Sequence, residues 1–127
     1  MGAANIHTWG AGFWDAAPDG IVVVDPSGRI ISANAAISLI SGYAQDELLG
    51  QTIEVLLPEH LHASHHSKVQ HFFKQPRRQS MGNGGVLWLQ RKDGSQLPVD
   101  IWLGTFDAEG DGSLAVAFVR DMTDVRR

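Results

Sequence analysis

The sequence predicts an α+β domain built on a single antiparallel sheet. Two β-branched runs joined by a short turn lie near the N-terminus, short helical segments follow, and three alternating runs close the chain. This order is typical of folds in which neighbouring strands pair as hairpins and the helices cover the sheet. A length of 127 residues suits one such domain with one hydrophobic core.

The first strands are expected over Ile21 to Asp25 and Arg29 to Ala33, with the turn Pro26-Ser27-Gly28 between them. Asn34 is expected to cap a short helix, because its side-chain oxygen can accept a hydrogen bond from an otherwise unpaired amide. Gly42 should end that helix. Short helical pieces are then expected over Gln45 to Leu49 and Thr52 to Leu56.

The longest helix candidate runs from Glu59 to Lys74 and is ended by Pro76. Its apolar stripe recurs at steps of three and four residues and comprises Leu61, His65, Val69 and Phe72 or Phe73.

Three further strands are expected over Val86 to Arg91, Leu97 to Phe106 and Leu114 to Arg120. If Asp93 and Gly94 form a two-residue turn, Trp88 lies opposite Val99.

The composition argues against several classes of function. The chain has 14 acidic residues against 10 Lys and Arg, a net charge of −4, which argues against nucleic acid as a partner. No apolar run approaches the roughly 18 residues of a membrane span. There is no cysteine to form a disulfide or a thiolate metal site, and no signal-peptide pattern, so a cytoplasmic location is expected.

The chain contains several short motifs: Asp19-Gly20-Ile21, Asn34-Ala35-Ala36, Gly42-Tyr43, Arg91-Lys92-Asp93-Gly94, Pro98-Val99 and the closing Asp121-Met122-Thr123. Together they resemble PAS domains, the sensor modules of bacterial signalling proteins, and the resemblance covers about Phe13 to Val125. It implies a five-stranded antiparallel sheet with spatial order 2-1-5-4-3 and the helices from Asn34 to Lys74 on one face. In such domains the space between sheet and helices holds a cofactor, a metabolite, a lipid or nothing.

The resemblance also implies a domain plan. Residues 1–12 are expected to be a mobile lead-in, 13–125 the PAS domain and 126–127 the start of a connector to an output domain. Asp121 and Thr123 would pass the signal on. The expected function is a non-catalytic sensor or interaction module of a multidomain protein, such as a histidine kinase of a two-component system, a cyclic-dinucleotide enzyme or a transcription regulator.

Residues expected to line a ligand pocket come from the long helix and the second hairpin: His65, Val69, Phe72, Trp88, Val99, Ile101 and Leu103. Alternating apolar residues on a strand are equally expected of a filled core. A small apolar ligand and an empty or filled interior therefore stay open as alternatives.

His65 matches the position of the proximal haem ligand in oxygen-sensing PAS domains. Two residues oppose a haem site: Gly85 stands where those domains carry an arginine, and Trp88 would occupy space that a porphyrin needs. We therefore expect a structural histidine and no resident cofactor, and keep haem with His65 as axial ligand as the alternative.

Metal binding and catalysis have little support. His62 and His66 have the i, i+4 spacing of two metal ligands, but an exposed polar helix face has the same spacing. Ser64 and Ser67 lack the strand-to-helix elbow that presents a nucleophile, and the glycines of 82–85 lead into a strand. We expect neither a metal site nor an enzyme.

The opposite sheet face is expected to carry Asp100 and Trp102. An exposed Trp102, together with Phe13 and Trp14, suggests a covered surface and hence a homodimer. The alternative is that the chain's own lead-in, from Trp9 to Trp14, covers Trp102.

Overall fold

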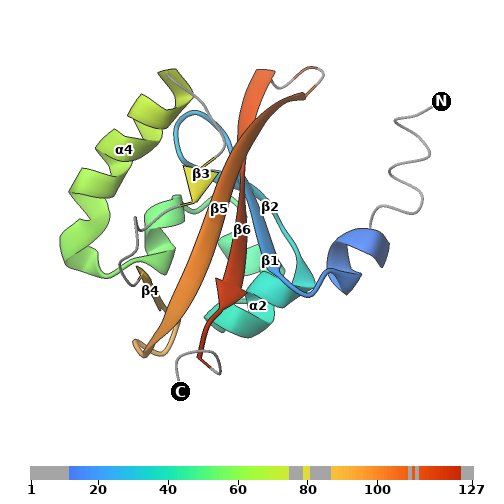
Figure 1. Cartoon of the computed structure of the whole chain (residues 1–127), viewed down its shortest axis with the longest axis vertical. Helices are drawn as coiled ribbons and strands as arrows, with labels where there is room; N and C mark the ends of the chain where they lie inside the picture. The colour runs from blue at the N-terminus through green and yellow to red at the C-terminus, as the bar shows by residue number, and fades with distance from the viewer. Residues whose placement is uncertain (1–11, 75–78, 81–86, 109, 111, 124–127) are drawn as a thin grey trace.

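The computed structural model describes residues 12–74, 79–80, 87–108, 110 and 112–123. One antiparallel sheet runs through the centre, and helices α2 to α4 lie on one side of it (Figure 1). The strands are β1 Gly20–Val24, β2 Ile30–Ala33, β3 Gln79–Ser80, β4 Leu87–Gln90, β5 Gln96–Ala108 and β6 Gly112–Asp121. The helices are a short turn over residues 12–16, α2 Ala35–Ser41, α3 Gln45–Leu48, the 3-10 turns η1 Ile53–Leu56 and η2 Glu59–Leu61, and α4 His62–Lys74.

The strand order is β2-β1-β6-β5-β3, and β4 also pairs with β5. Because β3 and β4 both occupy the edge next to β5, the order matches the predicted 2-1-5-4-3 plan of five strands. The first and last strands pair in the centre, from Gly20 opposite Val119 to Val24 opposite Ala115. The α+β class, the strand order and the helical layer on one face are all confirmed.

The predicted lead-in and connector fall outside the described residues, apart from residue 12 in the first helical turn. Within the described part of the chain, no helix is long and apolar enough to cross a bilayer.

Asn34 joins three elements at the start of the helical layer. Its side chain is fully buried, and its Oδ1 accepts hydrogen bonds from the backbone N–H of Ile37 (3.1 Å) and Ile21 (2.8 Å). Its Nδ2 donates to the carbonyl oxygens of Trp14 (3.0 Å) and Asp19 (3.1 Å). The predicted cap of α2 therefore also fixes the entry to β1 and the helical turn that precedes it.

Helix α2 packs directly on β1 at Gly20. A Cβ atom at this position would lie 2.9 Å from Cδ1 of Ile37 and 3.2 Å from its Cα. Only glycine allows so close an approach, so this half of the helical layer is tightly packed.

The β4–β5 turn differs from the predicted two-residue turn. Arg91 N–H donates to Ser95 O (2.8 Å) and Gly94 N–H donates to Arg91 O (2.9 Å), which leaves a three-residue loop. Gly94 has φ +89°, and Asp93 Oδ1 accepts from both the N–H and the hydroxyl of Ser95. These bonds lower the pKa of Asp93 and stabilise a wider turn with glycine in the left-handed region.

The wider turn shifts the strand register by one residue. Trp88 lies opposite Pro98, and Leu87 lies opposite Val99. The predicted pairing of Trp88 with Val99 is therefore wrong. Since side chains alternate between sheet faces, the shift brings Leu87 and Leu89, rather than Trp88, onto the face of Val99.

Replacing Asn34 with alanine is expected to lower the free energy of unfolding by about 2–3 kcal/mol, because two buried amides and two carbonyls lose their partner together. Chemical denaturation measures the loss. The control Gln51→Ala removes an exposed amide and should change stability by no more than about 0.5 kcal/mol. Equal stability of the two variants would contradict the central role of Asn34.

Candidate functional site: a cavity between α4 and the sheet

A cavity of about 870 Å³ lies between α4 and the inner face of the sheet. Of the 13 residues of α4 only Phe72 is buried. This helix therefore packs less closely on the sheet than α2 does. The volume is within the range of sites that hold small organic ligands.

The lining is mostly apolar and comes from β1, η1, α4 and strands β4 to β6. All seven residues predicted to line a pocket contribute to it: His65, Val69, Phe72, Trp88, Val99, Ile101 and Leu103. Val99 and Phe72 are buried, whereas Trp88 is 42% exposed and therefore lies at the rim. An apolar cavity with few polar groups suits a ligand with an apolar body.

His65 pairs with a buried carboxylate. Its Nδ1 lies 2.6 Å from Oε2 of Glu54, on η1, and the Glu54 side chain is only 7% exposed. An ionised carboxylate can only accept, so Nδ1–H is the donor, and whenever the ring is neutral its lone pair is on Nε2. Oε1 of Glu54 is 3.9 Å from Nδ1 of His66.

Sequence reasoning did not find Glu54. The sequence signal was a single carboxylate within the otherwise apolar segment Ile53–Leu56, in which Glu54 and Leu56 are buried. A buried carboxylate needs hydrogen-bonding partners, and the histidines of the following helix were available.

His62 and His66, which have the i, i+4 spacing of metal ligands, each contact a different group. His62 Nε2 lies 2.8 Å from the carbonyl oxygen of Leu57, and His66 Nε2 lies 3.3 Å from Nε2 of Gln70. Among the described residues no three or more His, Asp or Glu side chains gather as metal ligands would.

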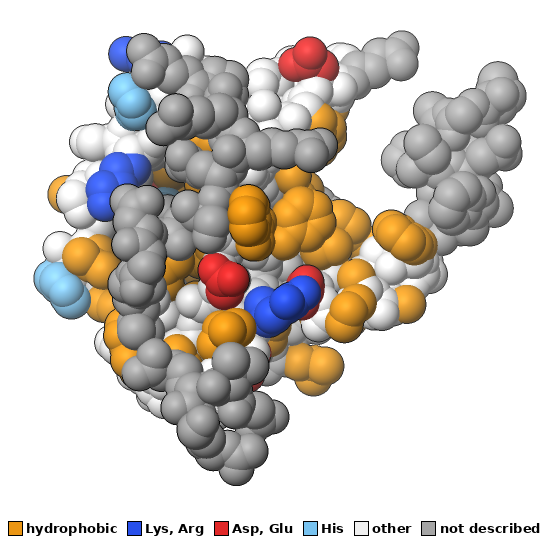
Figure 2. Space-filling view, in the orientation of Figure 1, with side chains coloured by type: hydrophobic (Ala, Val, Ile, Leu, Met, Phe, Trp, Pro, Cys, Tyr) orange, Lys and Arg blue, Asp and Glu red, His pale blue; other side chains and the backbone are white. Residues whose placement is uncertain are grey.

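The outer face of the sheet carries a row of large apolar side chains. Phe118 on β6 lies between Ile21 on β1 and Trp102 on β5, so the three share this face. Trp102 is 54% and Phe118 42% exposed, whereas Ile21 is buried. Figure 2 shows this face with hydrophobic side chains gathered over the central strands.

A polar row borders the apolar one. Arg120 lies opposite Asp100 in the β5–β6 ladder, and its Nε and Nη2 each lie 3.2 Å from a carboxylate oxygen of Asp19. The neighbouring Asp19 carboxylate raises the pKa of Arg120. The outer face thus combines an apolar centre with a charged margin.

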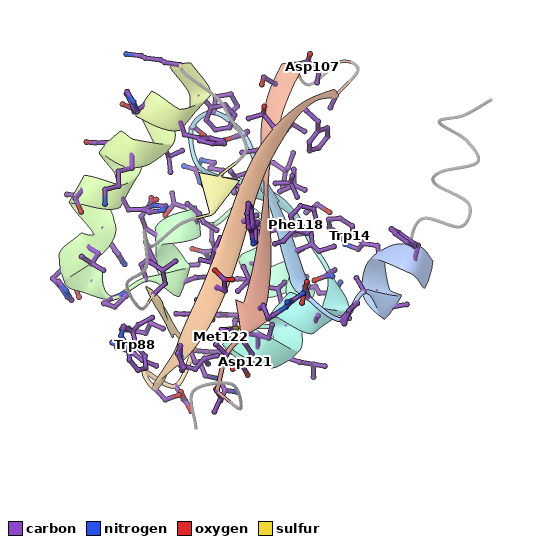
Figure 3. All side chains as sticks on the ribbon, viewed as in Figure 1. Trp14, Trp88, Asp107, Phe118, Asp121 and Met122 are labelled. Atoms are coloured by element: carbon purple, nitrogen blue, oxygen red, sulfur yellow. The ribbon has the colours of Figure 1, made fainter. Side chains whose placement is uncertain are left out.

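The predicted signal exit is ordered by its own hydrogen bonds. Asp121 Oδ1 accepts from the N–H (2.9 Å) and the hydroxyl (2.6 Å) of Thr123. The backbone of Asp121 pairs with Val99, which lines the cavity, and Met122 N–H donates to Pro98 O (2.9 Å). Figure 3 shows Asp121 and Met122 together at the end of β6.

The model of the PAS domain family matches residues 18–124. The chain is a PAS domain. A solved structure, the PAS domain of an HTR-like protein from Haloarcula marismortui, is similar with a TM-score of 0.74 and 24% identity, covering 93% of this chain and 98% of that one. A PAS domain from a two-component sensor histidine kinase gives a TM-score of 0.75 at 13% identity, covering 94% and 98%.

Two curated sensor proteins are similar to this chain by sequence. The PAS domain is 27% identical over 107 residues to the sensor protein FixL of Bradyrhizobium diazoefficiens, and 28% identical over 102 residues to the oxygen sensor protein DosP of Escherichia coli. These matches cover 84% and 80% of this chain but only 21% and 13% of the relatives. PAS domains of this kind are sensor modules within larger signalling proteins, and the module itself is typically non-catalytic.

The Glu54–His65 pair gives a prediction for the histidine ring. When its ring is neutral, His65 should carry its proton on Nδ1, whereas a histidine without such a partner usually carries it on Nε2. Long-range ¹⁵N–¹H spectra of the imidazoles distinguish the two forms. Glu54→Leu should convert His65 to the Nε2–H form and leave the exposed His71 unchanged. A His65 ring that is Nε2–H in the wild type contradicts the pairing.

Proposed function

We propose that this PAS domain is a non-catalytic sensor module that binds a small, largely apolar ligand between α4 and the sheet. The observation that carries the proposal is the apolar cavity of about 870 Å³ beneath a helix that buries only Phe72. A ligand there would supply the contacts that α4 otherwise lacks. The whole protein would be a multidomain signalling protein, such as a histidine kinase, a cyclic-dinucleotide enzyme or a transcription regulator.

The ligand could be coupled to the end of the domain through one strand pair. Val99 lines the cavity, and its backbone partner is Asp121, which holds Thr123 through two hydrogen bonds. A shift of β5 on ligand binding would therefore act directly on the proposed signal exit. The output domain would receive the change at this point.

Filling the cavity is expected to abolish ligand binding. Ala117 on β6 lines it and lies opposite Leu103, so the phenyl ring of Ala117→Phe would occupy ligand space. Nile red, a neutral apolar dye, should fluoresce with the wild type and with the control Ser113→Phe, which changes an exposed residue of the same strand. The fluorescence should be lost with Ala117→Phe.

Fluorescence that survives in Ala117→Phe but is lost in Trp102→Glu would place the dye on the outer face. That result would contradict the cavity as the ligand site.

One observation favours haem as the alternative ligand. A metal-bound histidine usually donates its second ring nitrogen to a carboxylate or carbonyl, as His65 does to Glu54, and the lone pair on Nε2 then suits an axial bond to iron. Haem would supply the binding of a diatomic gas. The objection from Trp88 is weakened by its place at the rim, and Gly85 lies outside the described residues.

We expect hemin titration of the wild type to give no one-to-one Soret band, with His65 acting as a structural partner of Glu54. Accordingly, His65→Ala should lower the free energy of unfolding by about 1–3 kcal/mol, because a buried carboxylate loses its donor. A stoichiometric Soret band that is present in the wild type and in His71→Ala but lost in His65→Ala would establish the haem sensor instead.

We also propose that the domain forms a homodimer through the outer sheet face. Trp102, Phe118 and Phe106 are all more than 40% exposed there, and Gly104, which has no side chain, lies between Trp102 and Phe106 on the same strand face. A two-fold interface could insert aromatic side chains of one copy beside the other, with the Arg120 and Asp100 row at its margin. Phe13, 69% exposed, and Trp14 on the N-terminal turn would extend this interface.

Trp102→Glu is expected to shift the wild-type dimer to a monomer in sedimentation velocity, because it buries a charge in the apolar centre of the interface. The control Leu39→Glu changes an 81% exposed side chain on α2, on the opposite side of the sheet, and should leave the dimer intact. A wild type that remains monomeric at the highest concentrations would remove the proposal.

A further inference from the structure

One side of the cavity mouth is polar, and an entirely apolar ligand would leave its side chains without a partner on the ligand. Residues at steps of three and four along η2 and α4 line the cavity and are exposed: His60, Ser64, Ser67, Lys68 and His71. This spacing places them along one side of the helix, beside the half-buried His65 and Val69. The cavity therefore has an apolar floor and a polar edge formed by α4.

The charge on this edge has one sign. Lys68 is the charged lining residue at neutral pH, three histidines accompany it, and no Asp or Glu lines the cavity among the described residues. Glu54, on the same 3-10 turn as the lining residues Ile53 and Leu56, is directed at His65 by the 2.6 Å hydrogen bond. This contrasts with the net charge of −4 of the whole chain and favours an anionic group at the mouth.

We infer that the natural ligand is an amphipathic monocarboxylic acid, with its aliphatic chain in the cavity and its carboxylate at Lys68. The inference rests on the proposed ligand-binding function and specifies the class of ligand. The aliphatic chain would cover the apolar residues of β5 and β6, such as Ile101 and Leu103. The carboxylate would remain near water at the exposed edge, where it keeps part of its hydration.

The test compares two probes that differ in the head group, decanoate and decanol, by displacement of Nile red below their aggregation concentrations. Decanoate is expected to bind more tightly than decanol to the wild type. In Lys68→Met, which keeps the aliphatic stem, the Kd of decanoate should rise about fivefold, the size of one partly exposed charge pair, while that of decanol stays constant. Added salt should weaken decanoate binding alone.

Lys74→Met is the matched control. Lys74 lies on the same helix but does not line the cavity, so its replacement removes the same charge from the protein without altering the mouth. Decanoate affinity should be unchanged in this variant.

Two results overturn the inference and can be told apart. If decanol binds as tightly as decanoate and Lys68→Met has no effect, the carboxylate is not recognised, although the apolar site stands. If neither compound displaces the dye from the wild type, and the dye itself binds equally to Ala117→Phe, the ligand-binding function fails as well.

Discussion

The hydrogen bonds of Asn34 are the constraint on which the helical layer depends. One buried amide holds the helical turn at 12–16, the start of β1 and the first turn of α2 in fixed relation. Together with the close approach of Ile37 to Gly20, it fixes α2 against the sheet. An amide side chain can do this because it offers two acceptor sites and two donors, all of which are used here.

The helical layer is consequently uneven. Where α2 meets β1 the packing is tight, whereas α4 buries only Phe72 and leaves a cavity over β5 and β6. Helix α4 is held at its N-terminal end by His65 on Glu54 and by His62 on the carbonyl of Leu57. The polar contacts thus position α4 with few apolar ones, and a ligand could add to its packing without displacing core residues.

Much of the fold follows from local sequence signals. The run at Ile21, the cap at Asn34 and the stripe of Val69 and Phe72 each predicted the element that forms. β-branched residues favour strands, an Asn side chain can cap a helix, and apolar residues three or four positions apart lie on one helix face. The register of β4 could not be predicted in the same way. Asp93-Gly94 suits both a two-residue turn and a three-residue loop, and the hydrogen bonds of Ser95 to Asp93 select the latter.

The cavity-lining residues could be predicted from their alternation, but the cavity itself could not, since a filled core has the same pattern. The Glu54–His65 pair joins residues from two helical segments whose relative placement no local signal defines.

The central claim is that an apolar chain enters the space between α4 and the sheet. Intermolecular NOEs from decanoate to a domain with labelled methyl groups measure this directly. We predict cross-peaks from its terminal methyl to Ile101 and Leu103, which line the cavity. Cross-peaks confined to Ile21 and to the rings of Trp102 and Phe118, which share the outer face, would contradict the account.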